Sequence, residues 1–290
     1  MEKGAARNKM TLKIVADSAC DVPVDLAKAL DITVIPVYIN IGANSYLDGT
    51  ELPRQFFFNN LDSYSPYPTT SAPAIGAFTE TYERLADEGA TEILSIHIAA
   101  SLSNTWNAAR LGAEAVSSVP VTVFDTKQVS LGAALLIITA AEMSANGRTL
   151  SEIIAFLSAH LPQTRLFGML DTLESLRRSG RVNWAEFGIG TLLQIKPILM
   201  IADGAISVLA KVRTRKRSIQ QLLELVNSFG PFEKLAVAHV NAPEAAATLK
   251  ELALSIFPDA ATWPIMAIGP AVGTHLGLDA VGFACVGRAS

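Results

Sequence analysis

Short β-branched runs alternate with amphipathic helical patterns from Leu12 onward, and this rhythm leaves few folds open. Strand-like runs occupy residues 12–18, 32–40, 91–98 and 119–125, with helical patterns at 23–30 and 104–116 between them. Such alternation is typical of βα units around a mainly parallel sheet. The run at 93–98, ILSIHI, is apolar on both faces, as expected of a strand covered by helices on both sides.

The pattern changes after Arg148. A helical stretch at 149–161 leads to the apolar run at 164–170 and to a helical region through Leu193. Two strand-like runs then flank Asp203–Gly204, a dipeptide that favours a tight hairpin turn. Further strand and helix patterns follow at 235–240, 243–257 and 262–269. We therefore expect an α/β fold of two domains, one at 11–162 with a mainly parallel sheet and one at 163–290 with a mixed sheet. We expect the first ten or eleven residues to be disordered.

Composition narrows the class of protein. The chain has 290 residues, of which 50% are hydrophobic, so it has enough apolar surface for large cores. Its two cysteines, Cys20 and Cys285, lie far apart, predicting buried thiols in place of a disulfide framework or a zinc site. No apolar run is long enough to cross a bilayer, and the first ten residues lack the apolar core of a signal peptide. We expect a cytoplasmic protein without stable membrane insertion.

Charge argues against a nucleic-acid partner. The formal net charge is −4, whereas nucleic-acid-binding domains are commonly basic. The distribution is uneven: residues 1–162 carry 10 basic and 17 acidic side chains, and residues 163–290 carry 13 and 10. The basic excess of the second half includes Arg177, Arg178 and Arg181, and then Lys211, Arg213, Arg215 and Arg217 at alternate positions. In an extended strand the second group shares one face, either as a solvated edge or as a surface for a phosphate-bearing partner.

Two clusters of hydroxyl side chains precede predicted helices. The first is Thr69, Thr70 and Ser71, in a proline-rich segment expected to be a stiff loop that runs into a helix. The second is Ser101, Ser103 and Thr105, where Ser103 or Asn104 also suits a helix N-cap. Hydroxyl groups and the free N–H groups of a helix start together suit an anion.

Other polar residues offer weaker indications of a site. Asp17, Asp21 and Asp125 end predicted strands, where ligands bind in open α/β sheets, although capping explains them equally. The histidines show no metal-ligand spacing, so no metal site is expected. His275 lies in a glycine-rich segment, 268–282, and no GxSxG motif accompanies it.

Six motifs, in this order and over nearly the whole chain, resemble those of the DegV family of bacterial fatty-acid-binding proteins. They are DSACD, TTSAPAIG, SLSNTW, LESLRRSGRV, KPIL and VGTHLG. The resemblance implies that a long-chain fatty acid lies in an apolar tunnel between two α/β domains, with its carboxyl group near the surface. It further implies that a separate ATP-dependent kinase phosphorylates that carboxyl group, so the chain itself is not an enzyme and needs no cofactor.

The resemblance also assigns residues. It implies that Thr70, Ser71, Ser103 and Asn104 bind the carboxyl group, with His275 nearby through a water. It places kinase docking or phosphoryl transfer on Arg181 and Arg213. The apolar segment 187–201 is a candidate lining of the tunnel, although ordinary core explains it as well.

The chain departs from the family pattern at three places. Ser179–Gly180 stands where members often have two glycines, Asn104 stands where they have one, and Leu278–Asp279 replaces a glycine-rich continuation after the histidine. An extra acid near the head group would oppose binding of an anion. Two other functions stay open on the sequence alone: a hydrolase or acyltransferase that uses Ser103 with His275, and a lipid store or sensor without a kinase.

Overall fold

The structure, a computed structural model, describes residues 11–181 and 195–288. Its four-stranded sheet is parallel throughout, with the order β2–β1–β6–β7. The strands are β1 (Leu12–Asp17), β2 (Ile32–Ile35), β6 (Glu92–His97) and β7 (Val121–Asp125). All four therefore end at the same edge of the sheet, where the polar loops that follow them come together.

A six-stranded sheet of order β10–β9–β8–β13–β11–β12 forms the other half of the molecule. Its neighbours are antiparallel except for β11 and β12, so the sheet is mixed. Its strands are β8 (Thr164–Met169), β9 (Lys196–Ala202), β10 (Ala205–Val212), β11 (Phe232–His239), β12 (Ile265–Ala267) and β13 (Val281–Gly287).

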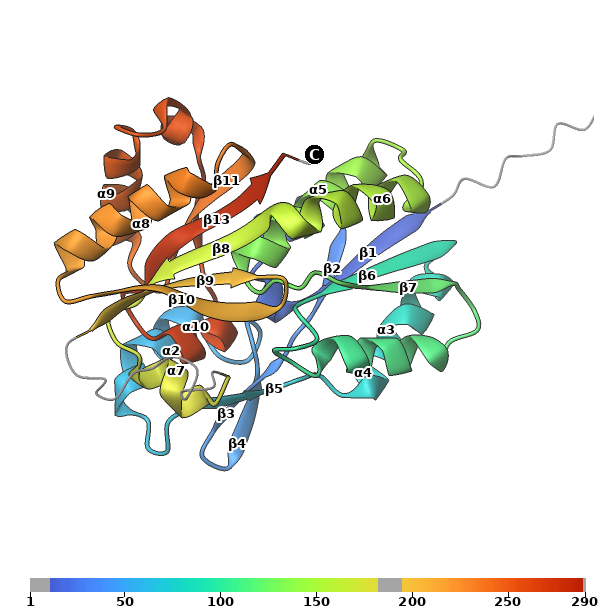
Figure 1. Ribbon diagram of the computed structural model, residues 1–290. Coiled ribbons are helices and arrows are strands. Elements are labelled where there is room, and N and C mark those ends of the chain that lie inside the picture. The colour runs from blue at the N-terminus through green and yellow to red at the C-terminus, as the bar shows by residue number, and fades with distance from the viewer. Residues whose placement is uncertain (1–10, 182–194, 289–290) are drawn as a thin grey trace, which may run out of the picture.

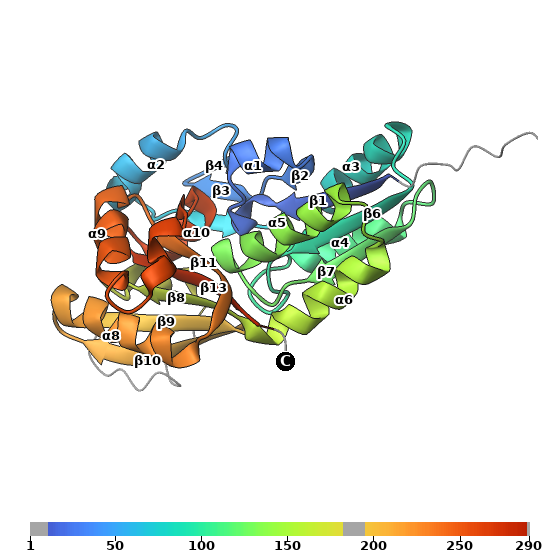
Figure 2. The ribbon, with the colours of Figure 1, turned by 90° about the horizontal axis from the view of Figure 1, so that it is seen from above.

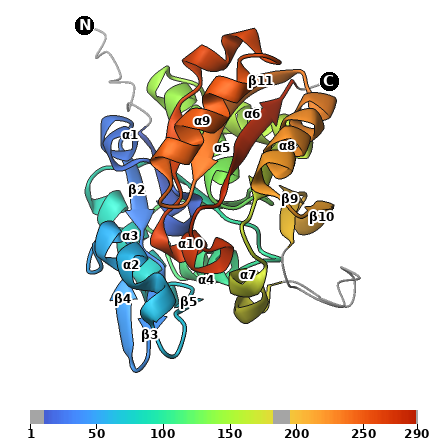
Figure 3. The same ribbon diagram turned by 90° about the vertical axis from the view of Figure 1, so that its left-hand side faces the viewer.

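A small antiparallel sheet joins the two halves on one side (Figure 3). Its order is β4–β3–β5, with β3 (Tyr38–Ile41), β4 (Asn44–Leu47) and β5 (Thr69–Ser71). It packs against α10 (Pro270–Leu276), which in turn contacts α2 (Arg54–Asn60) and α7 (Glu174–Ser179). This arrangement brings β5 of the N-terminal half beside a helix of the C-terminal half.

Helices and sheets alternate in layers (Figures 1 and 2). Helices α3 (Ile75–Asp87) and α4 (Thr105–Glu114) share a core with the outer face of the parallel sheet. Helices α8 (Arg215–Phe229) and α9 (Pro243–Ala253) do the same for the outer face of the mixed sheet. The remaining elements are α1 (Val24–Ala29), α5 (Leu131–Ala145), α6 (Leu150–His160) and the 3₁₀ turns Ser18–Cys20, Leu61–Ser63, Leu161–Gln163 and Pro258–Thr262.

Helix α5 lies between the two sheets, and this position explains its apolar composition. It contacts β1 on one side and β8, β11 and β13 on the other. Every residue from Leu131 to Ala141 is buried, and the helix has no polar face there. A helix that is apolar all round is expected where protein covers it on all sides. One continuous core consequently spans the inner faces of both sheets.

Several sequence predictions are confirmed. The fold is α/β with a parallel and a mixed sheet, the Asp203–Gly204 turn joins β9 to β10, and both cysteines are buried with free thiols. The division into domains after residue 162 stays a prediction. No helix in the described part of the chain is both long and apolar enough to cross a membrane.

Three local predictions are wrong. The run at 32–40 is two strands in different sheets, because Pro36 has no N–H to continue a ladder. The predicted loop at 69–71 is the edge strand β5, which pairs with β3. The basic run at 211–217 is extended only as far as Val212, the end of β10: the Thr214 side chain accepts a hydrogen bond from Arg217 N and caps α8, so the four basic side chains do not share a strand face.

Two predictions concern residues outside the described ranges. One is the disorder expected for the first ten or eleven residues, of which only residue 11, immediately before β1, is described. The other is the helical region expected through Leu193, of which α7 is described and ends at Ser179.

Candidate functional site

A cavity of about 270 Å³ lies between the two halves of the molecule. Its polar lining residues come from β5, from the loop before α4, from the segment after α7 and from α10, and they are Thr70, Ser71, Ser103, Asn104, Arg181 and His275. All of the remaining lining residues are aliphatic: Ala19, Val37, Ala72, Ile98, Leu102, Val129, Leu166, Leu176, Ile201, Ile206, Ala271, Val272 and Leu276. The cavity thus combines a hydrogen-bonding region with an apolar interior, which suits an amphipathic ligand.

Thr70 and His275 are in direct contact across the two halves. The Thr70 hydroxyl and His275 Nε2 are 2.8 Å apart, while His275 Nδ1 is buried without a hydrogen-bond partner in the described part of the chain. Burial, and to a smaller degree the charge of Arg181, lower the pKa of His275 from 6.5 to about 4. The imidazole is therefore neutral at pH 7 and carries a single N–H.

Ser103 and Asn104 shape the turn into α4. The Ser103 hydroxyl accepts a hydrogen bond from Thr105 N at 3.2 Å and shares one with the Thr105 hydroxyl at 2.8 Å. Asn104 is the N-cap residue by position, but its side chain makes no capping bond and instead accepts from Asn107 Nδ2. The capping expected of this pair is thus only partly present, and both residues line the cavity.

The other predicted residues are placed differently from one another. Ser71 lines the cavity, and its hydroxyl accepts a hydrogen bond from Asn40 Nδ2 on the neighbouring strand. Arg181 also lines the cavity, directly after α7. Arg213 is exposed between β10 and α8 and is not a lining residue. Asp279, the acid that was expected to oppose binding of an anion, is likewise exposed and does not line the cavity. Its backbone carbonyl accepts a hydrogen bond from the Arg215 side chain.

A Ser103–His275 dyad is not formed. His275 is hydrogen-bonded to Thr70, Ser103 is hydrogen-bonded to Thr105, and among residues 11–181 and 195–288 no acid orients the imidazole through Nδ1. A nucleophilic serine needs a base within hydrogen-bond reach, and that base is normally oriented by a third group. The hydrolase reading therefore has no support in the geometry of the described residues.

A Ser–His–Asp chain does exist elsewhere, but it is inaccessible. Asp17 Oδ2 lies 2.9 Å from His97 Nδ1, His97 Nε2 lies 2.7 Å from the Ser95 hydroxyl, and that hydroxyl bonds Tyr82. Asp17, Ser95 and His97 are all 0% exposed. Because no substrate reaches a fully buried serine, this chain of hydrogen bonds satisfies buried polar groups and holds the ends of β1 and β6 together.

The acids of DSACD act as local anchors. Asp17 accepts from Ala19 N at the start of the turn after β1. Asp21 accepts from Gly269 N at 2.7 Å and from the Ser130 hydroxyl, which ties the turn after β1 to the starts of α5 and α10. Burial raises the pKa of Asp21 to about 7. Within residues 11–181 and 195–288, no cluster of three His, Cys, Asp or Glu side chains is arranged to hold a metal ion.

The apolar lining was largely missed from sequence. Of the predicted lining segment 187–201, Ile201 is a lining residue of this cavity, and residues 187–194 lie outside the described ranges. Leu102, Val129, Leu166, Ile206 and Leu276 carry no sequence signal that separates a cavity wall from an ordinary core. The one available signal was adjacency in sequence to the hydroxyl and histidine motifs: Leu102 precedes Ser103, and Leu276 follows His275.

Comparison with known proteins gives a consistent result. The family model described as "Uncharacterised protein, DegV family" matches residues 11–288. A DegV domain-containing protein of Listeria innocua is 33% identical over 274 residues, covering 93% of this chain and 96% of the relative.

Solved structures agree with the fold. A fatty acid binding DegV family protein from Streptococcus agalactiae superposes with a TM-score of 0.87 and 27% identity, over 96% of this chain and 99% of that one. DegV, a fatty acid binding protein from Bacillus subtilis, gives a TM-score of 0.84 and 30% identity, over 96% and 100% of the two chains.

Proposed function

The chain belongs to the DegV family, and from this membership and the geometry of its cavity we propose that it binds one long-chain fatty acid. The observation that carries the proposal is the Thr70–His275 pair beside Ser103 in a cavity whose other walls are mainly aliphatic. The fatty-acid binding of the Streptococcus agalactiae and Bacillus subtilis relatives supports it. In this proposal the carboxyl group lies against Thr70, Ser71, Ser103 and Asn104, and the acyl tail occupies the apolar walls.

The neutral histidine sets the direction of the hydrogen bonds. A threonine hydroxyl has a single proton, so it cannot donate both to His275 and to a carboxylate. If His275 carries its proton on Nε2, the imidazole donates to Thr70 and the Thr70 proton is free for the carboxylate. We therefore assign the Nε2–H tautomer to the form that binds the acid. This chain of donors stabilises an anion without a salt bridge that would tie up both of its oxygens.

The tail supplies most of the affinity. Burying one methylene contributes about 0.8 kcal/mol, so a long acyl chain gains on the order of 10 kcal/mol before the costs of ordering. The head group contributes less, because neutral hydrogen bonds replace those the carboxylate made with water. Its role is to fix the register of the acid in the cavity.

We further propose that a partner kinase phosphorylates the bound carboxyl group. Arg181 lines the cavity near His275 and offers a guanidinium for phosphate, whereas Arg213 lies on the exposed surface, where it suits docking of the partner. The sequence contains no GxxxxGK[ST] loop, so ATP is expected to come from the partner and the chain alone to be inactive. A cytoplasmic location is part of the same proposal.

The kinase step is tested by reconstitution with ATP, Mg²⁺ and a cognate kinase. Arg181→Ala and Arg213→Ala are each expected to lower acyl-phosphate formation by about tenfold or more, because each removes a contact to the phosphate or to the partner. Fatty-acid affinity is expected to change little. Acyl phosphate made from ATP by this chain alone, or full activity of both variants, contradicts this part of the proposal.

Carboxyl recognition is tested by replacing the hydroxyl of Thr70. Thr70→Val keeps the side-chain shape, removes the donor and leaves a buried N–H of His275 unpaired, so palmitate binding is expected to weaken by about 1–3 kcal/mol. Isothermal titration of the delipidated protein measures this loss.

The controls use the same strand. Thr69 is exposed on β5 and does not line the cavity, so Thr69→Val is expected to bind like the parent. Thr70→Ser keeps the hydroxyl and is expected to restore most of the affinity. Methyl palmitate, which has no carboxylate, is expected to bind more weakly to the parent and equally to parent and Thr70→Val. Equal palmitate affinity of the parent and Thr70→Val refutes the assignment of the head group.

A further inference from the structure

A second, smaller chamber adjoins the apolar part of the main cavity. It has a volume of about 30 Å³, and its lining is entirely apolar in side-chain type. The residues that line it are Leu166, Phe167, Gly168, Leu170, Leu199, Ile201, Ala238, Ile268, Leu276, Ala280, Val281 and Gly282. Leu166, Ile201 and Leu276 line both spaces, so their side chains form the partition between them.

The partition is part of regular structure. Leu166 on β8 and Ile201 on β9 are direct partners in the antiparallel ladder, and Leu276 is the last residue of α10. Leu166 and Ile201 are 5% and 6% exposed, so neither has free space to swing into solvent. A wall built from side chains on paired strands is expected to hold its position more firmly than one built on a loop.

The space behind the partition exists because two of the residues around it are glycines. Gly168 on β8 pairs with Gly282 on β13, so no side chain from either residue fills the chamber. A Cβ on Gly282 would lie 1.9 Å from the Phe167 carbonyl oxygen, so that position excludes any larger residue. A Cβ on Gly168 would meet only Leu170 Cδ1, at 3.6 Å, which is an ordinary contact.

We propose that the partition of Leu166, Ile201 and Leu276 sets the longest acyl tail that the main cavity accepts. The inference rests on the proposed function, since it concerns the same cavity. A tail that reaches the partition must stop or bend there, because these three side chains fill the space between the two cavities. Beyond it, about 30 Å³ of apolar space has room for one or two groups of the size of a water molecule. Opening the partition therefore admits an acid longer by about two methylenes.

The test compares two truncations on the same strand. Ile201→Ala removes part of the partition, whereas Leu199→Ala enlarges the small chamber from the same face of β9 without touching the partition. Affinities for myristate, palmitate, stearate and arachidate are measured for each delipidated variant. Ile201→Ala is expected to shift the preference toward the longer acids by about tenfold relative to the parent, as two extra buried methylenes predict. Leu199→Ala is expected to keep the profile of the parent.

Two further variants make the result decisive. Leu276→Ala opens the partition from α10 and is expected to give the same shift, which covers the case in which Ile201→Ala does not fold. Adding Gly168→Ala to either variant places a methyl group in the small chamber and is expected to reduce the gain for the longest acid.

The outcomes separate this inference from the proposed function. If the parent binds none of the four acids, the proposed function fails. If the parent binds them but the folded Ile201→Ala and Leu276→Ala variants keep its chain-length profile, or Leu199→Ala shifts it equally, the partition does not set tail length.

Discussion

At the scale of single residues, the decisive feature is a histidine kept neutral by burial beside a threonine. A charged imidazole would attract a carboxylate more strongly, but it would also be costly to bury in this apolar cavity. In the proposed function the neutral ring instead works through its hydrogen bond with Thr70. In the proposed function, hydroxyl and imidazole donors hold the anion and leave one of its oxygens available to the partner kinase.

The lowered pKa of His275 predicts a stability that depends on pH. Between pH 6.5 and about 4, the unfolded chain binds a proton at this histidine and the folded chain does not, so stability falls as pH decreases through that window. The full effect is on the order of 3 kcal/mol. His275→Gln keeps a polar side chain without this titration. Urea unfolding at neutral pH and at pH 4.5 is expected to show a smaller acid-induced loss for His275→Gln than for the parent, and equal losses would contradict the assignment.

The polar part of the cavity was approached from sequence in two ways: residue types drew attention to the hydroxyl clusters and the histidine, and the family resemblance assigned them to one head group. Thr70 and Ser103 stood out because they belong to hydroxyl clusters ahead of predicted helices, and His275 because it lies in a glycine-rich segment. The structure brings them to one cavity, and their role in binding a carboxyl group is the proposal made above. Arg213 could not be placed from sequence. Its position depends on Thr214 as the N-cap of α8, and the alternating charges suggested a strand at this point.

At the scale of elements, the β9–β10 hairpin closes one side of the cavity. Ile201 and Ile206, on either side of its turn, both line the cavity. The turn itself is held by the N-terminal half: the Ser101 hydroxyl donates to the Gly204 carbonyl at 2.6 Å, and Gly204 N donates to the Lys127 carbonyl at 2.8 Å. Lys127 also pairs with Asp203 at 2.9 Å. The hairpin therefore connects the two sheets beside the proposed acyl tail.

Gly204→Ala tests how firmly this turn is held. Gly204 has a φ of +74°, and a Cβ there would lie 2.7 Å from the Ser101 hydroxyl oxygen. The substitution is expected to destabilise the fold by more than the roughly 1–2 kcal/mol that left-handed backbone alone costs. Gly42→Ala is the matched control, because Gly42 has a φ of +61° with nothing within 4 Å. Denaturant unfolding compares the two variants, and equal losses of stability would show that the turn is not tightly packed against Ser101.

Elements with strong local signals were predicted and the others were not. The hairpin followed from Asp203–Gly204, and the parallel strands followed from their apolar runs. Strand β13, which lies inside the mixed sheet, was missed because its neighbourhood is rich in glycine. One of those glycines, Gly282, is needed for close approach of the backbone of β8, a contact that only the folded sheet reveals. Strand β5 was missed because its partner β3 lies about thirty residues away in sequence.

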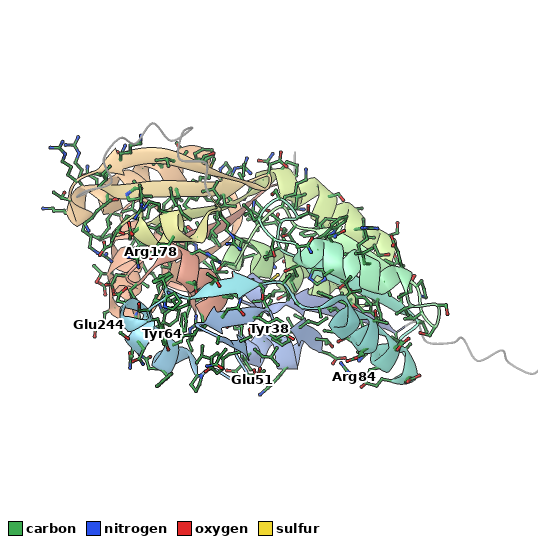
Figure 4. All side chains as sticks on the ribbon, turned by 90° about the horizontal axis from the view of Figure 1, so that it is seen from below. Tyr38, Glu51, Tyr64, Arg84, Arg178 and Glu244 are labelled. Atoms are coloured by element: carbon green, nitrogen blue, oxygen red, sulfur yellow. The ribbon has the colours of Figure 1, made fainter. Side chains whose placement is uncertain are left out.

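At the scale of the whole molecule, function depends on contacts between the halves. Thr70 meets His275, Tyr67 donates to the Thr274 carbonyl, and Asp21 accepts from Gly269 N. Arg178, on α7 (Figure 4), places its guanidinium 5.0 Å from the centre of the Tyr67 ring. These contacts lie around α10, so binding of a fatty acid in the cavity is expected to stabilise the packing of the two halves against each other.

The central claim is that one long-chain fatty acid occupies the cavity of each chain. Native mass spectrometry of the full chain purified from a bacterial host tests it most directly, followed by denaturing extraction and lipid analysis. The account predicts an added mass that matches one fatty acid per chain, lost on denaturation and regained when delipidated protein is given palmitate or oleate. Protein that carries no acid as purified and takes up neither acid afterwards would contradict it.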